Sequence, residues 1–334
     1  MRPLFSPSPF FVLALALTLL SLTACSPPGP SEGSIAPGEL KVVATTGMIG
    51  DLAAQLVGDL GTVTTLMGPG VDPHLYKALE SDVRTLSEAD LILYNGLYLE
   101  GKMGDVLVKL ARTRPVVAVS ERVGEDRLRE PPELEGAYDP HIWFDVSLWL
   151  EAVAPVEAAL VELLPGESQL IGQRADELRE RLRAMDQWVE GQIATIPEEH
   201  RVMITAHDAF GYFGDRYNIE VVGIQGISTA SEAGLADVER VVDLIVERRV
   251  PAVFIESSVP RRAIEAVQAA ARARGHEVRI GGELFSDAMG AVGTPQGTYN
   301  GMVRHNVETV VKALVGDLDE AAADSVVTAE EGTP

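Results

Sequence analysis

Two short stretches of the sequence carry the same three residues, and each ends in a histidine. They are Asp72-Pro73-His74 and Asp139-Pro140-His141, and their histidines lie 67 residues apart in a chain with six histidines. Asp is a favourable helix N-cap and Pro a favourable first helical residue, so helices are predicted at 75–86 and from Val146 onwards. Either stretch alone would be interpreted as an ordinary capped helix start with an incidental histidine, because a motif of three residues often occurs by chance. Two of them in one chain favour a pair of equivalent ligands.

Two further polar residues, His207 and Asp287, follow predicted strands. With His74 and His141 they supply three imidazoles and one carboxylate, a donor set that suits zinc, manganese or iron. His207 alone is compatible with a polar residue satisfied at a strand end, and Asp287 alone with a loop cap. The coincidence of all four at one inferred edge favours a closed metal site. Free histidine titrates near pH 6.5, so protons are expected to compete with metal as the pH falls from about 7 to 5.

The first half of the chain alternates predicted strands and helices. The strands are expected at 40–45, 63–67, 89–95 and 116–119, and the helices at 47–57, 75–86 and 103–112. This alternation predicts a parallel sheet with helices on both faces. Ligands of such sheets bind at the carboxyl ends of the strands, and His74 follows a strand end through the turn Gly68-Pro69-Gly70.

A long amphipathic helix is predicted at 168–193, between two similar α/β halves. The second half is expected to have strands at 201–206, 218–223, 251–256 and 277–280, with helices at 235–248 and 261–274. We therefore predict two lobes, each a mainly parallel four-stranded sheet flanked by helices, joined by one long connecting helix. The predicted parts are an N-terminal lobe at 39–165, a connecting helix at 166–197, a C-terminal lobe at 198–317 and an acidic tail at 318–334. Fraying is expected from Gly316 onwards.

The N-terminus is typical of a secreted and lipidated protein. An apolar run at 10–22 is too short to span a membrane and ends in Leu22-Thr23-Ala24-Cys25, which resembles the lipobox of bacterial lipoproteins. Cys25 is the single cysteine, so no disulfide framework is expected. These features predict a signal peptide at 1–24, a lipid anchor at Cys25 and a flexible tether at 25–38. The formal net charge of −23 argues against binding to nucleic acid.

Six stretches between residues 40 and 315 occur in a distinctive order. They are Val43-Ala44-Thr45-Thr46, Gly70-Val71-Asp72-Pro73-His74, Asp139-Pro140-His141-Ile142-Trp143, Thr205-Ala206-His207-Asp208-Ala209-Phe210, Phe254-Ile255-Glu256-Ser257-Ser258 and Gly282-Glu283-Leu284-Phe285-Ser286-Asp287. In these stretches the chain resembles the TroA-like manganese/zinc-binding lipoproteins, the solute-binding proteins of bacterial metal ABC importers. The resemblance implies two α/β lobes with one metal ion between them, bound by His74, His141, His207 and Asp287.

The resemblance also implies where the protein works and with which partners. It implies a lipid-anchored, extracytoplasmic protein that delivers its metal to a membrane permease with an ATPase, both separate chains, and we expect a monomer. Many zinc-specific members have a His-rich loop, and the loop at 121–138 has no histidine, which favours manganese. Many manganese-specific members have Glu where this chain has His207. Three His and one Asp occur in members linked to either metal, so zinc stays open and iron is a further option.

Two other function classes are compatible with parts of the sequence. A metal-dependent hydrolase would explain His207-Asp208, but it needs an open metal position for water and a general acid or base. Four protein ligands leave little room for either, so no enzymatic activity is expected. A surface adhesin lipoprotein would explain the anchor, but it would not require the four ligands.

Overall fold

The computed structural model describes residues 35–132, 134 and 136–330, and the predicted signal peptide and Cys25 lie outside them. Four parallel strands form the first sheet in the order β2-β1-β3-β4. Their bounds are β1 (Leu40–Ala44), β2 (Gly61–Thr65), β3 (Leu91–Tyr94) and β4 (Val116–Ala118). The predicted parallel sheet of the first half is therefore confirmed.

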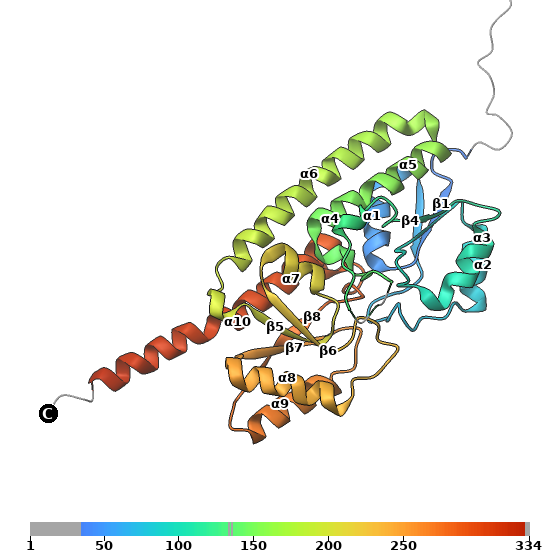
Figure 1. The fold of residues 1–334 in the computed structure, drawn as a ribbon. Helices are drawn as coiled ribbons and strands as arrows, with labels where there is room; N and C mark the ends of the chain where they lie inside the picture. The colour runs from blue at the N-terminus through green and yellow to red at the C-terminus, as the bar shows by residue number, and fades with distance from the viewer. Residues whose placement is uncertain (1–34, 133, 135, 331–334) are drawn as a thin grey trace, which may run out of the picture. The chain divides into compact units, whose positions relative to one another are not determined.

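Apolar side chains cover both faces of this sheet. Successive strand residues point to opposite faces, so Val42 of β1 packs into one hydrophobic cluster and Val43 into another. Helix α1 (Gly47–Val57) contributes to the first cluster, and α2 (Glu80–Glu88) and α3 (Gly104–Leu110) contribute to the second. Figure 1 shows α1 on one side of the strands and α2 with α3 on the other.

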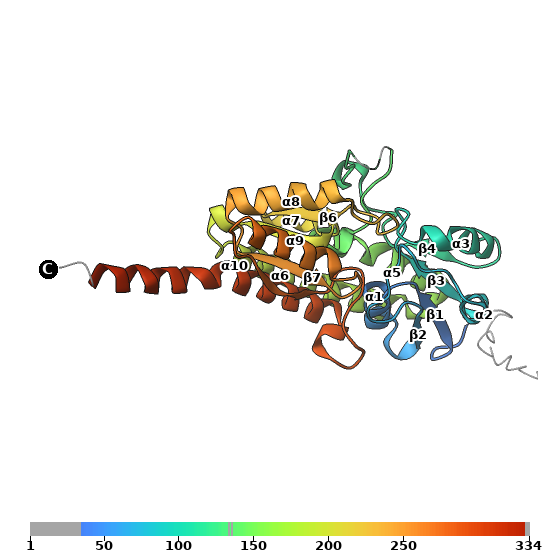
Figure 2. The ribbon, with the colours of Figure 1, turned by 90° about the horizontal axis from the view of Figure 1, so that it is seen from below.

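The four strands of the second half form two parallel pairs, β5–β6 and β7–β8, instead of one continuous ladder. Their bounds are β5 (Val202–His207), β6 (Glu220–Gln225), β7 (Ala252–Glu256) and β8 (Arg279–Leu284). Strands β5 and β7 lie side by side, so their carboxyl ends meet at one edge. Helices α8 (Leu235–Arg248) and α9 (Arg262–Ala273) cover one face through a cluster that includes Val241 and Val267. Figure 2 shows α8 and α9 beside these strands.

A large hydrophobic cluster connects the two halves. It runs from β1 through α4 (Val146–Glu151), α5 (Val153–Leu163) and α6 (Ser168–Ile193) to β7, β8 and α10 (Tyr299–Glu330). The long α6, in yellow-green in Figure 1, is the predicted connecting helix. Its buried residues repeat at intervals of three or four, as an amphipathic helix requires: Ile171, Ala175, Leu178, Leu182, Met185, Val189 and Ile193.

Three local predictions are wrong. The helix expected from Leu75 begins only at Glu80, and His74 lies in a turn before it. Helix α4 begins at Val146 as predicted, but His141 lies before a short 3-10 turn and not in the first turn of the helix. The N-cap of α4 is Asp145, whose carboxylate accepts the backbone N–H groups of Ser147 and Leu148. Helix α10 continues to Glu330 instead of fraying from Gly316, consistent with the high helix propensity of its Ala-rich end. The short α7 (Gly211–Tyr217) was not predicted.

No helix in the part of the chain that the structure describes is both long and apolar enough to cross a membrane.

Candidate metal centre

The structure brings His74, His141, His207 and Asp287 together. Each offers one ligand atom, and the four atoms lie within 4.8 Å of one another. All four side chains are buried. The two histidines of the first half thus meet the two ligands of the second half at the carboxyl ends of the strands, as predicted for parallel sheets.

The distances in this group fit a small cation at its centre. The Nε2 atoms of His141 and His207 lie 3.3 and 3.2 Å from the carboxylate oxygens of Asp287, and the Nε2 atom of His74 lies 3.8 Å from them. The Nε2 atoms of His74 and His141 are 3.2 Å apart. A tetrahedral site with metal–ligand distances of about 2.1 Å has neighbouring ligand atoms about 3.4 Å apart. The four residues therefore need little rearrangement to enclose one metal ion.

His141 is oriented by the aspartate of its own motif. Asp139 Oδ1 accepts the backbone N–H of His141 at 3.0 Å and contacts the ring Nδ1 at 2.7 Å. An imidazole that donates from Nδ1 to a carboxylate keeps Nε2 free as a ligand, and the carboxylate makes that nitrogen more basic. The Asp139 carboxylate therefore orients the histidine and does not cap a helix, which explains why His141 does not lie in the first turn of a helix.

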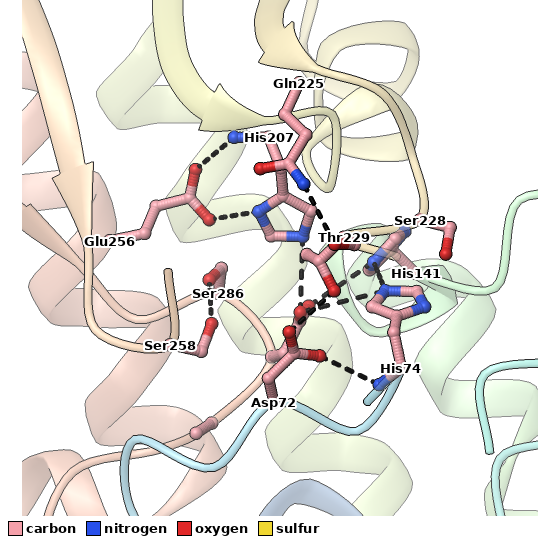
Figure 3. Close-up of polar contacts among 12 residues, drawn as sticks. Asp72, His74, His141, His207, Gln225, Ser228, Thr229, Glu256, Ser258 and Ser286 are labelled. Carbon is pink, nitrogen blue, oxygen red and sulfur yellow. Dashed lines mark hydrogen bonds and ion pairs between the residues drawn. The ribbon is translucent and has the colours of Figure 1, made fainter. Parts of the chain in front are cut away.

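His207, the last residue of β5, has an equivalent partner on the neighbouring β7. Glu256 Oε1 accepts the backbone N–H of His207 at 2.9 Å, and Glu256 Oε2 lies 2.5 Å from the ring Nδ1. Figure 3 shows Glu256 against one side of the His207 ring, with the opposite ring nitrogen directed at the site. Sequence reasoning did not assign a role to Glu256, because the pairing depends on β5 and β7 being neighbours.

Asp287 is held from both halves of the molecule. It follows β8 by three residues, and Asn306 of α10 fixes this loop by exchanging two hydrogen bonds with the backbone of Phe285. Trp143 Nε1 donates a hydrogen bond to the carbonyl oxygen of Ser286 at 3.1 Å. These contacts place the carboxylate between the three imidazoles.

Burial and neighbouring charges shift the pKa values of the four residues in different directions. Burial lowers the pKa of His74 to about 4, and Asp287 only partly opposes this shift. Burial also lowers the pKa of His141, but the carboxylates of Asp139 and Asp287 outweigh it and raise this pKa to about 9. The pKa of His207 is likewise raised well above its usual value, because Glu256 and Asp287 outweigh burial. Burial alone would raise the pKa of Asp287, but His207 and His141 hold it well below its usual value.

Several atoms of the group lack conventional partners. Both carboxylate oxygens of Asp287 and the Nε2 atom of His207 are buried, yet they make no hydrogen bond of standard geometry with the described residues. Buried polar atoms without such bonds are rare, and such atoms commonly bind a water molecule or an ion. Neutral imidazole nitrogens and a carboxylate are the donors that borderline divalent metals prefer. The residues present therefore fit a metal ion.

Comparison with known proteins agrees with this geometry. The family described as ZnuA, zinc-uptake complex component A periplasmic, matches residues 42–313. The manganese-binding lipoprotein MntA of Bacillus subtilis is 47% identical over 302 residues, which cover 90% of this chain and 97% of the relative. The zinc-binding protein TroA of Treponema pallidum is 48% identical over 303 residues, which cover 91% of this chain and 98% of the relative.

A solved structure supports the same assignment. The periplasmic zinc-binding protein TroA from Treponema pallidum superimposes with a TM-score of 0.81 and 50% sequence identity, covering 83% of this chain and 99% of that structure. The predicted α/β fold and the predicted resemblance are both confirmed. The chain belongs to the ZnuA family, to which its ordered motifs and its buried cluster of three histidines and one aspartate also point.

Proposed function

We propose that this protein binds one divalent transition metal ion through His74, His141, His207 and Asp287 and delivers it to the permease of an ABC importer. The single observation that carries the proposal is the convergence of three imidazole Nε2 atoms and one carboxylate on a common buried point. A permease and an ATPase, encoded as separate chains, would take up the released ion. The four protein ligands leave little space for a reacting water, so transport explains the site better than hydrolysis does.

The metal is proposed to be manganese or zinc. The relatives described above include a manganese-binding lipoprotein and a zinc-binding protein. The absence of histidine from the loop at 121–138 favours manganese. Three imidazole ligands favour zinc on intrinsic affinity, because zinc lies above manganese and iron in the divalent series. Manganese would then be loaded only where it is in excess over zinc.

Metal binding is expected to raise the unfolding temperature by about 5 °C or more at a metal concentration 100-fold above the dissociation constant. Such an excess contributes about 2.7 kcal/mol to stability, because the site exists only in the folded chain. One kcal/mol corresponds to roughly 2–4 °C for a domain of 150–250 residues. Calorimetry of chelator-treated protein with and without Zn²⁺ or Mn²⁺ checks this result. Mg²⁺ serves as the control, since it prefers oxygen ligands and should leave the transition unchanged. Equal unfolding temperatures with and without Zn²⁺ and Mn²⁺ would contradict the proposal.

The protein is further proposed to be held at the outer face of a membrane by a lipid on Cys25. The support is the lipobox-like Leu22-Thr23-Ala24-Cys25, together with a relative that is itself a lipoprotein. The Cys25→Ala variant is expected to lose all incorporation of a labelled fatty acid, whereas Ser26→Ala should be labelled like the wild type. Gel electrophoresis of cells grown with the label gives the readout. Labelling of the Cys25→Ala variant at the wild-type level would contradict the anchor.

A further inference from the structure

His74 differs from the other two imidazoles in how it is held. The Nδ1 atoms of His141 and His207 each contact a carboxylate, from Asp139 and Glu256 respectively. Within the described residues no acidic partner contacts Nδ1 of His74. His74 is also 7% exposed, whereas His141 and His207 are fully buried. The orientation of its ring therefore depends more on its backbone segment.

That segment, residues 68–79, has neither helix nor strand and connects β2 to α2. It begins with the predicted turn, in which Gly70 adopts a left-handed backbone with φ of 72°. Beyond His74 the side chains of Leu75 and Leu79 are exposed, whereas those of Tyr76 and Ala78 are only partly buried against the cluster that contains Val43. A segment without helix or strand and with only partly buried apolar side chains opens at lower free energy than the sheets on either side of it.

One hydrogen bond ties this segment to the second half of the molecule. Thr229 Oγ1 donates to Asp72 Oδ2 at 2.6 Å, and Asp72 Oδ1 accepts the backbone N–H of His74 at 2.9 Å. We call the Thr229–Asp72 bond the latch. Among the described residues it is the only hydrogen bond between segment 68–79 and the second half, apart from contacts within the ligand group. Figure 3 shows the Asp72 carboxylate between Thr229 and His74.

The donor of the latch is fixed to the end of β6, the strand that pairs with the strand of His207. The side-chain amide of Gln225, the last residue of β6, donates to the carbonyl oxygens of Thr229 at 3.0 Å and Ser231 at 2.6 Å. Gln225 pairs with His207 in the β5–β6 ladder. A continuous set of hydrogen bonds therefore runs from the strand end at His207, through Gln225, Thr229 and Asp72, to His74.

The second ligand of the first half is held much more firmly. The His141 segment is tied to the second half by three hydrogen bonds: Trp143 Nε1 to Ser286 O, Tyr299 Oη to Trp143 O, and Tyr212 Oη to Asp139 O. The shared hydrophobic cluster also joins the two halves. Moving His74 with its segment breaks one such hydrogen bond, whereas moving His141 breaks three and disturbs the buried core.

We propose that Thr229 is a positioning residue that controls metal release, because its hydroxyl holds Asp72 and thereby keeps His74 on the metal. This inference rests on the proposed function, since it assumes that His74 is a ligand. Metal leaves when the latch opens and His74 swings away with segment 68–79, while His141, His207 and Asp287 stay in place. Loss of the hydroxyl should therefore speed dissociation more than it slows association.

The test measures Zn²⁺ release from the full-length protein into excess chelating dye by stopped flow. Thr229→Val keeps the shape of the side chain and removes the hydroxyl. It is expected to accelerate release about tenfold, the ratio for loss of one hydrogen bond to a charged group. The association rate should change by less than about threefold, because the other three ligands are unaffected. Thr229→Ser, which keeps the hydroxyl, should restore wild-type release, and Ser228→Ala should release metal like the wild type.

A double-mutant comparison separates the latch from general stability. In an Asp72→Ala background, Thr229→Val should have no further effect on release, since the acceptor is already gone. The decrease in unfolding temperature caused by Thr229→Val should be larger in the metal-loaded than in the metal-free protein, because the latch also keeps His74 on the metal. The latch proposal is wrong if Thr229→Val releases Zn²⁺ at the wild-type rate or if Thr229→Ser releases it as fast as Thr229→Val. It is also wrong if Thr229→Val lowers the unfolding temperature equally with and without metal. A wild-type protein that binds no Zn²⁺ would instead refute the proposed function.

Discussion

Replacing Asp287 with asparagine is expected to weaken metal binding by at least about 100-fold while the chain stays folded. Asp287 is the one carboxylate in the group, and its oxygens lie 3.2 to 3.8 Å from the Nε2 atoms of all three histidines. Asparagine keeps the shape and one oxygen but removes the negative charge that offsets a buried cation. Removing a partner that only supports a ligand costs 10–100-fold in metal affinity, so removing a charged ligand should cost at least the upper end of that range.

Isothermal titration of Zn²⁺ and Mn²⁺ into wild type and Asp287→Asn measures this loss. Glu283→Gln is the matched control, because Glu283 is an exposed carboxylate on β8, four residues before Asp287. Its removal changes the net charge equally and should leave the affinity unchanged. In metal-free Asp287→Asn, the pKa values of His141 and His207 should fall, because Asp287 helps to raise both. Wild-type affinity in Asp287→Asn would remove this residue from the ligand set.

Metal affinity is expected to rise about 100-fold per pH unit as the pH increases from about 6 to 8. In the metal-free protein, the raised pKa values of His141, about 9, and of His207 keep both rings protonated at pH 7. The lowered pKa of His74, about 4, keeps that ring neutral. Each metal ion must therefore displace about two protons, because only a deprotonated nitrogen binds metal. The competition weakens as the pH approaches 9, where His141 loses its proton.

The same shifts predict an opposite trend for the metal-free protein. A histidine whose pKa is raised on folding contributes stability that is present below its unfolded value, 6.5, and is lost as the pH rises through its folded value. The unfolding temperature of the metal-free chain should thus fall between pH 6.5 and 9. The increase caused by metal should grow over the same range.

Titration calorimetry in two buffers of different ionisation enthalpy counts the displaced protons. We expect about two per metal ion at pH 7, and the same number for His305→Gln, which alters a histidine outside the site. Release of fewer than one proton, or an affinity that does not change between pH 6 and 8, would show that His141 and His207 are not protonated ligands of the metal-free state.

The sequence by itself was sufficient for most of the architecture. Hydrophobic periodicity predicts α8 at the bounds that the structure shows and α6 as the connecting helix, because both helices bury one apolar face. The same pattern predicts that His207 and Asp287 follow strands, and in the structure His207 is the last residue of β5 and Asp287 lies three residues after β8. The ordered motifs, taken with the family resemblance, select the four residues that the structure brings together. These features are local in the chain, so residue type and spacing are enough to predict them.

Only the tertiary structure decides how each histidine is held. Glu256 reaches His207 because β5 and β7 are neighbours, and Thr229 reaches Asp72 across 157 residues of chain. The carboxylate of Asp72 accepts hydrogen bonds from the Thr229 hydroxyl and from the backbone N–H of His74, and it does not cap a helix at Leu75. Local helix propensity could not predict this, because Thr229 is distant in the sequence. The expected competition with protons between pH 7 and 5 also moves to higher pH, because buried carboxylates raise the pKa of His141. The burial of a residue and the charges beside it depend on packing between distant segments, so the spacing of residues in the sequence cannot predict these pKa shifts.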